Sequence, residues 1–140
     1  MKRKMKRQQG FTLIELLVVL AILAMLAALV VPRVFRNLDK AKVNTAKAQI
    51  SAFESALGAY RLDVGSYPTT DQGLQALRIR PAGVENWDGP YLPKEIPLDS
   101  WKHPYAYRCP SEHGDYEIVS YGADGREGGE GLDSDIESWK

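Results

Sequence analysis

The chain has 140 residues, with 18 basic and 18 acidic side chains and a single cysteine, Cys109. This length has room for one small domain beside a membrane anchor, and a single cysteine excludes an intrachain disulfide. The balanced charge is not that of a nucleic-acid-binding protein.

The first ten residues form a short basic segment that ends at Gly10. An apolar run follows from Phe11 to Val31, with Glu15 as its one charged residue. A secretory signal peptide is normally cleaved behind its apolar stretch at an Ala-x-Ala pattern, and residues 11–31 contain no such pattern. Cleavage after Gly10 would instead leave the apolar run in the mature protein. We therefore interpret residues 1–10 as a leader peptide and residues 11–31 as a membrane span.

The apolar run has the length of a transmembrane helix. At 1.5 Å per residue, a helix over residues 11–31 covers about 30 Å, which is the thickness of one bilayer core. By the positive-inside rule, the basic leader keeps the N-terminus in the cytoplasm, so residues 33 onward would lie in the periplasm of a bacterium. The leader cations are Lys2, Arg3, Lys4, Lys6 and Arg7, and their removal leaves 13 basic against 18 acidic side chains, a net charge of −5.

Residues 32–62 are predicted to continue the helix outside the membrane. Their apolar side chains recur mostly at steps of three and four, as on one face of an amphipathic helix: Val34, Leu38, Ala41, Ile50, Phe53, Leu57 and Tyr60. Pro32 stands at the junction, where its ring should kink or loosen the helix. A membrane helix that ends at its interface explains Pro32 equally well.

Residues 63–140 are predicted to form a small periplasmic head. The pattern indicates a short helix over residues 71–77, capped by Thr70 or Asp71, then a loop rich in proline and glycine, then antiparallel strands at 105–108 and 116–121. The expected fold class is therefore α+β. A head of about 80 residues has a marginal core, which a metal ion or self-association often supplements.

Glu15 needs a physical reason, because a carboxylate inside an apolar span costs about 2.5–3.5 kcal/mol. No cation follows it before Arg33. Cleavage after Gly10 would create a positive α-amino group on Phe11, and we hypothesise that Glu15 neutralises such an amine between subunits. The alternative is a glutamate that reaches toward the lipid headgroups.

The C-terminal stretch is rich in acidic residues and glycines. Asp124, Asp133 and Asp135 could supply hard oxygen ligands, which suit Ca²⁺ better than zinc. A solvated acidic loop is the alternative that the spacing leaves open. No zinc site is expected from Cys109, His103 and His113, and we find no pattern of catalytic residues. The three tryptophans are expected to pack the small core.

The junction formed by Gly10, Phe11, Thr12, Leu13 and Glu15 resembles the processing site of the type IV pilin and pseudopilin superfamily. The resemblance implies that a prepilin peptidase cleaves after Gly10 and methylates Phe11. It also implies that Glu15 meets the N-terminus of a neighbouring subunit. We accordingly assign both Glu15 and Pro32 a part in subunit assembly.

Two further stretches, residues 65–77 and 120–139, resemble the major pseudopilin family of the type II secretion system. The resemblance implies a calcium ion held by Asp124, Asp133 and Asp135, with the backbone carbonyl of Tyr121 as a further ligand. One departure falls at residues 98–102, where the family usually reads Asp-Pro-Trp-Gly. The resemblance therefore does not decide the conformation of this turn.

The resemblance implies a subunit, not an enzyme, that polymerises into a periplasmic filament for export of folded proteins across the outer membrane. Its expected partners are copies of itself, minor pseudopilins, the prepilin peptidase, an inner-membrane platform with its assembly ATPase, and membrane lipid, with no nucleic acid. The alternatives are a type IV pilin of an adhesion or motility fibre, and an anchored periplasmic enzyme or calcium-dependent binding module.

Overall fold

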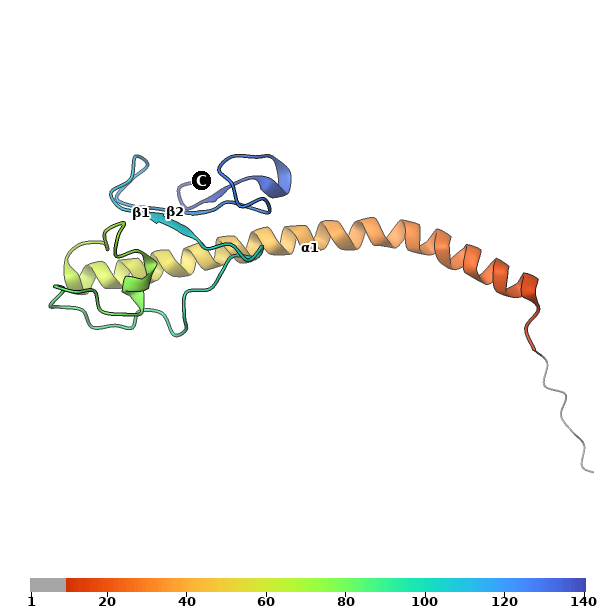
Figure 1. Ribbon diagram of the computed structural model, residues 1–140, viewed down its shortest axis with the longest axis horizontal. Helices are drawn as coiled ribbons and strands as arrows, with labels where there is room; N and C mark the ends of the chain where they lie inside the picture. The colour runs from red at the N-terminus through yellow and green to blue at the C-terminus, as the bar shows by residue number, and fades with distance from the viewer. Residues whose placement is uncertain (1–9) are drawn as a thin grey trace, which may run out of the picture. The chain divides into compact units, whose positions relative to one another are not determined.

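The computed structural model describes residues 10–140 (Figure 1). The elements follow in the order α1 (Leu13–Val64), η1 (Leu74–Leu77), β1 (Ala106–Arg108), β2 (Glu117–Ser120), η2 (Gly131–Asp133) and β3 (Ile136–Glu137), where η marks a 3₁₀ helix. One long N-terminal helix followed by a small antiparallel sheet confirms the α+β class. Apart from Gly10, the predicted leader peptide lies outside the described residues.

α1 is a single helix of 52 residues. It joins the two segments that were predicted separately over residues 11–31 and 32–62, and it continues through Pro32 without interruption. The chain divides into two compact units at Leu38. The described part of the first unit, residues 10–38, and the second unit, residues 39–140, are therefore treated in turn.

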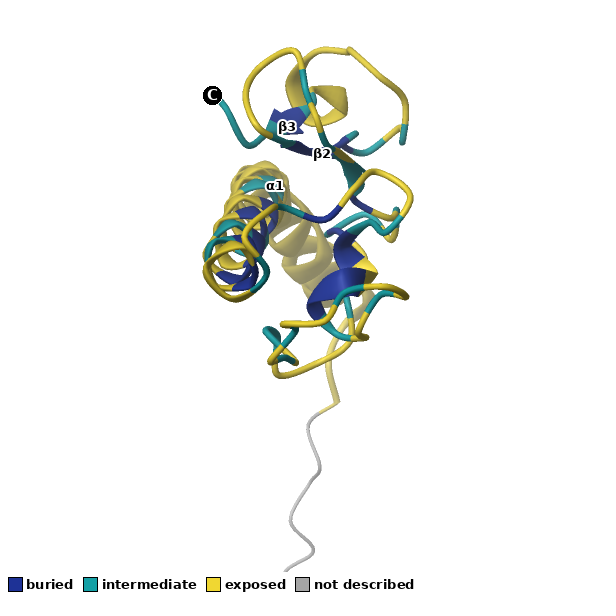
Figure 2. Ribbon diagram, turned by 90° about the vertical axis from the view of Figure 1, so that its left-hand side faces the viewer, coloured by how far each residue is buried: buried dark blue, intermediate teal, exposed yellow. Residues whose placement is uncertain are grey.

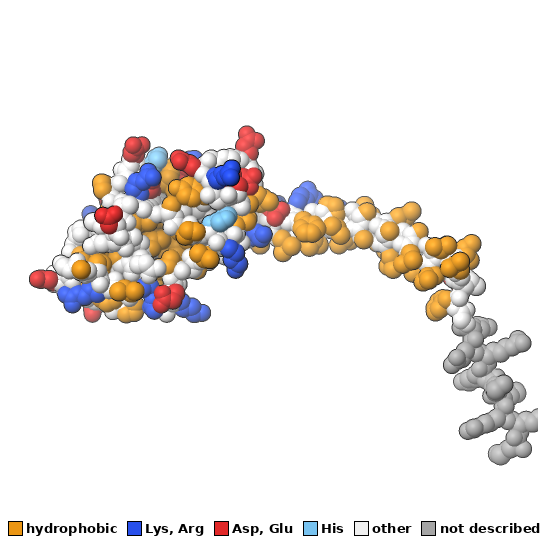
Figure 3. All heavy atoms as spheres, in the orientation of Figure 1, with side chains coloured by type: hydrophobic (Ala, Val, Ile, Leu, Met, Phe, Trp, Pro, Cys, Tyr) orange, Lys and Arg blue, Asp and Glu red, His pale blue; other side chains and the backbone are white. Residues whose placement is uncertain are grey.

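The first unit presents a bare apolar helix. Every residue from 10 to 38 is exposed, and the most apolar window of α1 reaches a mean hydropathy of 3.0 with none of it buried. Figure 3 shows hydrophobic side chains along this part of the helix. Among residues 10–140, α1 is the one helix whose length and composition would let it cross a membrane. An apolar surface of this extent is normally covered by lipid or by another protein.

The second unit has a core built on one face of α1. The buried side chains of this face recur at steps of three and four residues and are Ala46, Ile50, Phe53, Ala56, Leu57 and Tyr60. They pack against Leu77 of η1, Ile118 of β2 and Tyr105, the residue that precedes β1 (Figure 2). Burying one large apolar side chain contributes about 1.5–3 kcal/mol, so this face fixes the head onto the helix.

The sheet has three antiparallel strands in the order β1-β2-β3. Ala106 pairs with Val119 across β1 and β2, and Ser120 pairs with Ile136 across β2 and β3. The strands expected at 105–108 and 116–121 are present in shorter form. β3 was not predicted, because its two residues are too few to show a pattern.

The prediction for residues 71–77 was wrong in detail. The segment forms a turn followed by the 3₁₀ helix η1, whose N-cap residue, Gly73, provides no side-chain hydrogen bond. The expected cap, Thr70, bonds elsewhere: its hydroxyl lies 3.0 Å from both the backbone N–H and the carbonyl oxygen of Cys109. Thr69 and Gln72 close the preceding turn through reciprocal side-chain to backbone bonds of 3.3 and 2.9 Å.

Two of the three tryptophans contribute to the core as expected. Trp87 and Trp101 are half-buried and pack against the core cluster. Trp139 instead stacks on the imidazole of His113, with the two rings nearly parallel and their centres 4.0 Å apart. The tyrosines fill much of the space that tryptophan was expected to take, and Tyr60 is only 1% exposed.

Candidate functional site

The predicted cleavage position is open to a processing enzyme. Gly10 and Phe11 precede α1, and no atom beyond its neighbours approaches the position of a Cβ on Gly10. The Phe11 side chain is 91% exposed. Both residues are exposed, and neither is part of the helix.

Glu15 closes the first turn of α1 through a reciprocal pair with Thr12. The Thr12 hydroxyl accepts a hydrogen bond of 3.2 Å from the Glu15 backbone N–H, and the Glu15 carboxylate accepts one of 2.9 Å from the Thr12 backbone N–H. The Thr12 hydroxyl also donates to this carboxylate at 3.1 Å. This is a capping box, and the Thr-x-x-Glu spacing was a signal for it in the sequence. The carboxylate therefore has a local role at the start of α1, where it bonds the backbone one residue after Phe11.

The second group of predicted residues lies in the loop that joins β2 to β3. The two arms of this loop touch, because the Ala123 N–H donates to the Leu132 carbonyl at 2.9 Å. Gly122 is buried with φ 66°, and a Cβ there would lie 2.7 Å from the Leu132 oxygen and 2.9 Å from the Ser134 oxygen. Only glycine fits this position. The loop is thus closed tightly, with backbone carbonyls lining its inner side.

The predicted metal ligands occupy this loop but are not gathered into a cluster. Asp124 is exposed and accepts a bond of 3.1 Å from the Arg126 N–H, while Asp133 is exposed at the end of η2. Tyr121 and Asp135 are half-buried. Within residues 10–140, no three side chains of His, Cys, Asp or Glu lie close enough together to hold a metal ion.

Asp135 is the residue whose surroundings fit a cation. One carboxylate oxygen accepts a bond of 2.9 Å from the Gly128 N–H. The other, Oδ1, is buried and has no hydrogen-bond partner in the described chain. An unpartnered buried carboxylate oxygen is costly, and Ca²⁺ is a ligand that would satisfy it together with loop carbonyls. The donor chemistry therefore fits calcium, although the three carboxylates would have to draw together around the ion.

A residue that sequence reasoning missed, Asp99, supports the start of this loop. It is 3% exposed, and its carboxylate accepts bonds of 2.9 Å from the backbone N–H groups of Trp101 and His103 and one of 2.6 Å from the Ser120 hydroxyl. The His103 ring then donates from Nδ1 to the Gly122 carbonyl at 3.1 Å. Asp99 thus connects the turn at 98–102 to the end of β2 and, through His103, to Gly122 in the loop.

The turn at 98–102 also explains the departure from the family pattern. Lys102 has φ 71° and is the one non-glycine residue among those described with a positive φ. It occupies the position where the family usually has glycine. The turn is therefore kept, with a lysine in a backbone conformation that glycine adopts more easily.

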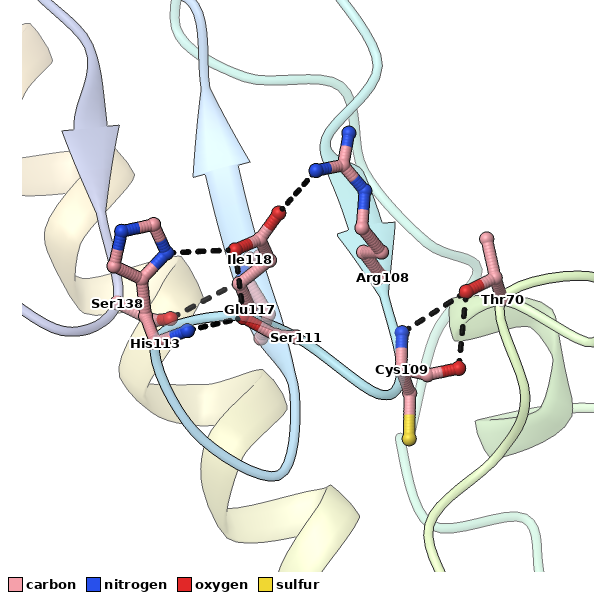
Figure 4. Close-up of polar contacts among 8 residues, drawn as sticks. All are labelled: Thr70, Arg108, Cys109, Ser111, His113, Glu117, Ile118 and Ser138. Atoms are coloured by element: carbon pink, nitrogen blue, oxygen red, sulfur yellow. Dashed lines mark hydrogen bonds and ion pairs between the residues drawn. The ribbon is translucent and has the colours of Figure 1, made fainter.

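A polar network around Glu117 holds the other side of the sheet (Figure 4). The Glu117 side chain is 9% exposed and accepts bonds from the Ser111 hydroxyl at 2.7 Å and from His113 Nδ1 at 3.0 Å. Arg108 pairs with it at 3.0 Å. The hydrogen bond from His113, then that from Ser111, holds the pKa of Glu117 below its ordinary value.

His113 has a structural role in this network. His113 bonds to Glu117 and stacks on Trp139, so it ties the β1–β2 connection to the C-terminal segment. Ser138 also bonds to the backbone of β2. Its N–H donates to the Ile118 carbonyl at 3.0 Å, and its hydroxyl accepts from the Ile118 N–H at 3.1 Å. No sequence motif signals the contacts of His113 with Trp139 and of Ser138 with Ile118, because these partners are 20 or more residues apart along the chain.

The fold and the two sites together define a pilin-like protein: an accessible glycine-phenylalanine junction, a long helix with a bare apolar first half, and a small α+β head. Comparison with known proteins gives the particular family. Residues 33–139 match the family model described as "Type II secretion system (T2SS), protein G", and residues 5–31 match the "Prokaryotic N-terminal methylation motif". The chain belongs to the type II secretion system protein G family, the major pseudopilins.

Individual relatives agree with this assignment. The chain is 47% identical to the type II secretion system core protein G of Pseudomonas aeruginosa over 137 residues, which is 96% of each chain. It is 46% identical to that of Vibrio cholerae, over 98% of this chain and 95% of the relative. The crystal structure of the major pseudopilin from enterohaemorrhagic Escherichia coli superimposes with a TM-score of 0.64 at 37% identity, over 75% of this chain and 92% of that one. These matches favour the pseudopilin over the type IV pilin alternative.

Proposed function

We propose that the chain is the repeating subunit of a type II secretion pseudopilus, anchored in the bacterial inner membrane until it polymerises. The observation that carries this proposal is the exposure of every residue from 10 to 38, with no part of the described chain covering the apolar helix. Lipid would cover it before assembly, and the helices of neighbouring copies would cover it afterwards. The α+β head would then face the periplasm.

The first step of the proposed mechanism is processing. A prepilin peptidase cleaves after Gly10 and methylates the amine of Phe11, both of which are accessible ahead of α1. Cleavage removes the basic leader and leaves residues 11–31 as a single membrane span. The orientation follows the leader charge, which keeps the N-terminus in the cytoplasm and residues 33 onward in the periplasm.

The second step is assembly, in which Glu15 has the proposed central part. Its carboxylate lies at the start of α1, so it can exchange its bond with the Thr12 N–H for the Phe11 amine of a neighbouring subunit. Neutralising both charges lowers the cost of keeping them in an apolar packing interface. Pro32 lacks an N–H for the helix ladder, so the helix at this junction can loosen when the subunit leaves the bilayer. The expected partners are minor pseudopilins and the platform and ATPase that extract the subunit.

Glu15→Ala tests the assembly step. We expect this variant to insert into the membrane as the parent does and to form no filaments. The control Glu54→Ala changes an acidic residue of α1 outside the membrane span, and it should leave both insertion and filament formation unchanged. Membrane association after alkaline washing measures insertion, and electron microscopy of sheared filaments measures assembly. Normal filaments from the inserted Glu15→Ala variant would contradict the proposal.

Calcium is the proposed cofactor of the C-terminal loop. Asp124, Asp133, Asp135 and the carbonyl of Tyr121 would hold it, and the ion would supply a positive charge that the unpartnered Oδ1 of Asp135 needs. The residues of the loop would then be stiffened around it. The role is structural, and we propose no catalytic activity for the chain.

Thermal unfolding with Ca²⁺ or with a chelator tests this part separately. A ligand at 100 times its dissociation constant adds about 2.7 kcal/mol to the folded state, which for a small domain is a shift of many degrees. We expect the shift to be lost in Asp124→Ala and Asp135→Ala and kept in Asp88→Ala. An equal unfolding midpoint of the parent chain in calcium and in chelator would contradict the calcium site and favour a solvated acidic loop.

A further inference from the structure

Five basic residues of α1 lie close behind the apolar run. Farther along the chain some basic residues, such as Arg61, Arg78 and Arg108, make ion pairs with acidic side chains, while others, such as Arg80 and Lys94, make none within residues 10–140. The five that follow the apolar run are exposed and make no ion pair with any residue from 10 to 140: Arg33, Arg36, Lys40, Lys42 and Lys47. This part of the helix therefore carries positive charge that the described chain does not neutralise.

Four of the five fall on one side of the helix. Arg33, Arg36, Lys40 and Lys47 are separated by three, four and seven residues. At about 100° per residue, their side chains leave the helix within a sector of roughly 60°. Like charges three and four residues apart repel one another and disfavour the helix. Asp39 is adjacent in sequence but makes no ion pair with them within the described residues. The repulsion would be relieved by a negative partner from outside the chain.

The distance along the helix separates these cations into two groups. Arg33 and Arg36 follow Val31, the last residue of the apolar run, by about 3 and 8 Å of helical rise. The headgroup layer of a bilayer is about 5–8 Å thick on each side. Long basic side chains adjust their reach to keep the charged group at this level. Lys47 is about 24 Å beyond Val31, well outside the layer.

We propose that Arg33 and Arg36 bind the phosphate groups of anionic phospholipids in the leaflet at the C-terminal side of the membrane span. The inference rests on the proposed membrane anchor, with which the site is continuous along α1. Guanidinium groups suit this partner because they match a phosphate with two parallel hydrogen bonds. The contact holds the processed subunit at a fixed depth, and the subunit gives it up when it leaves the bilayer for the filament.

The test compares lipid retention by the full processed chain. The chain is purified in a neutral detergent and titrated with phosphatidylglycerol or with phosphatidylcholine of the same chain length, and native mass spectrometry counts the bound lipids. A basic residue near an anionic surface contributes about a fivefold preference, so two should give about 25-fold. We expect the preference for phosphatidylglycerol to fall by about that factor in Arg33→Gln/Arg36→Gln. Lys47→Gln, on the same side of the helix but beyond the headgroups, should keep it.

Three results would overturn the inference. The first is an equal affinity of the parent chain for the two lipids. The second is an equal loss of the preference for phosphatidylglycerol in Lys47→Gln, which would show only general attraction between charges. The third is a double variant that keeps its lipid preference but fails to crosslink to other copies, which would make the arginines a subunit contact instead. Alkaline extraction of cell membranes tests the anchor independently: release of the parent chain would contradict the proposed function, whereas a retained chain without lipid preference would contradict this inference alone.

Discussion

Replacing Lys102 by glycine should stabilise the head. Lys102 has φ 71°, and its N–H donates to the Asp99 carbonyl at 3.1 Å, so the turn requires this left-handed conformation. For an L-residue the conformation costs about 1–2 kcal/mol, which glycine avoids. Glycine adds about 0.5–1 kcal/mol of unfolded-state entropy, which offsets part of the gain. The expected net stabilisation is about 0.5–1 kcal/mol.

Thermal unfolding measures this effect directly. At about 4–8 °C per kcal/mol for a domain of this size, the midpoint of Lys102→Gly should rise by roughly 2–8 °C. Two controls separate the causes. Lys102→Ala removes the exposed side chain but keeps the strain, so it should leave the midpoint nearly unchanged. Lys94→Gly adds glycine at an exposed loop lysine without a positive φ, so it should lower the midpoint. A midpoint of Lys102→Gly at or below that of Lys102→Ala would refute the reasoning.

Three further predictions concern the head. Gly129→Ala should destabilise the head more than Gly128→Ala in paired thermal melts. Both positions have a positive φ, but only at Gly129 would the new Cβ meet a neighbour, at 2.5 Å from the Asp133 carbonyl oxygen. Equal losses of stability in the two variants would contradict the loop geometry. Asp99→Ala should lower the free energy of unfolding in urea by about 3 kcal/mol, since it leaves buried donors unpaired, whereas exposed Asp88→Ala should change it by less than about 0.5 kcal/mol. The pKa of Glu117 is lowered by folding, so its stabilising contribution is present above the ordinary value of 4.5 and is lost as pH falls through the lower folded value. The stability difference between the parent and Glu117→Gln should accordingly shrink on acidification below pH 4.5, and a difference that grows would show that the network is not formed.

The sequence predicted the parts of this molecule that depend on local pattern. The helical period predicted Ile50, Phe53, Leu57 and Tyr60 on the buried face of α1, although Val34, Leu38 and Ala41, assigned to the same face, are exposed. The apolar run from Phe11 to Val31 predicted a helix that could cross a membrane. The junction at Gly10 and the family resemblance are likewise local signals. The comparisons confirm the family, while the metal ligands and the role of Glu15 stay predictions.

The features that sequence reasoning missed depend on contacts between distant segments. β3 is a strand because Ile136 and Glu137 pair with β2, not because of their own propensity. The carboxylate of Asp99 acquires its role from Ser120, 21 residues away, and Trp139 leaves the core because His113 offers a flat partner. The capping box of Thr12 and Glu15 is the exception. Its Thr-x-x-Glu spacing is a local signal, but only distant partners were predicted for the carboxylate because it lies in an apolar run.

The central claim is that Phe11 begins a mature chain that keeps its apolar helix, and intact mass spectrometry of the chain extracted from cell membranes tests it most directly. We predict a species with the mass of residues 11–140 plus one methyl group, with fragmentation placing the methyl on the Phe11 amine. Cells without a prepilin peptidase should yield the chain with its leader. A chain that keeps residues 1–10 in normal cells, or one that has lost the apolar segment, would contradict the account.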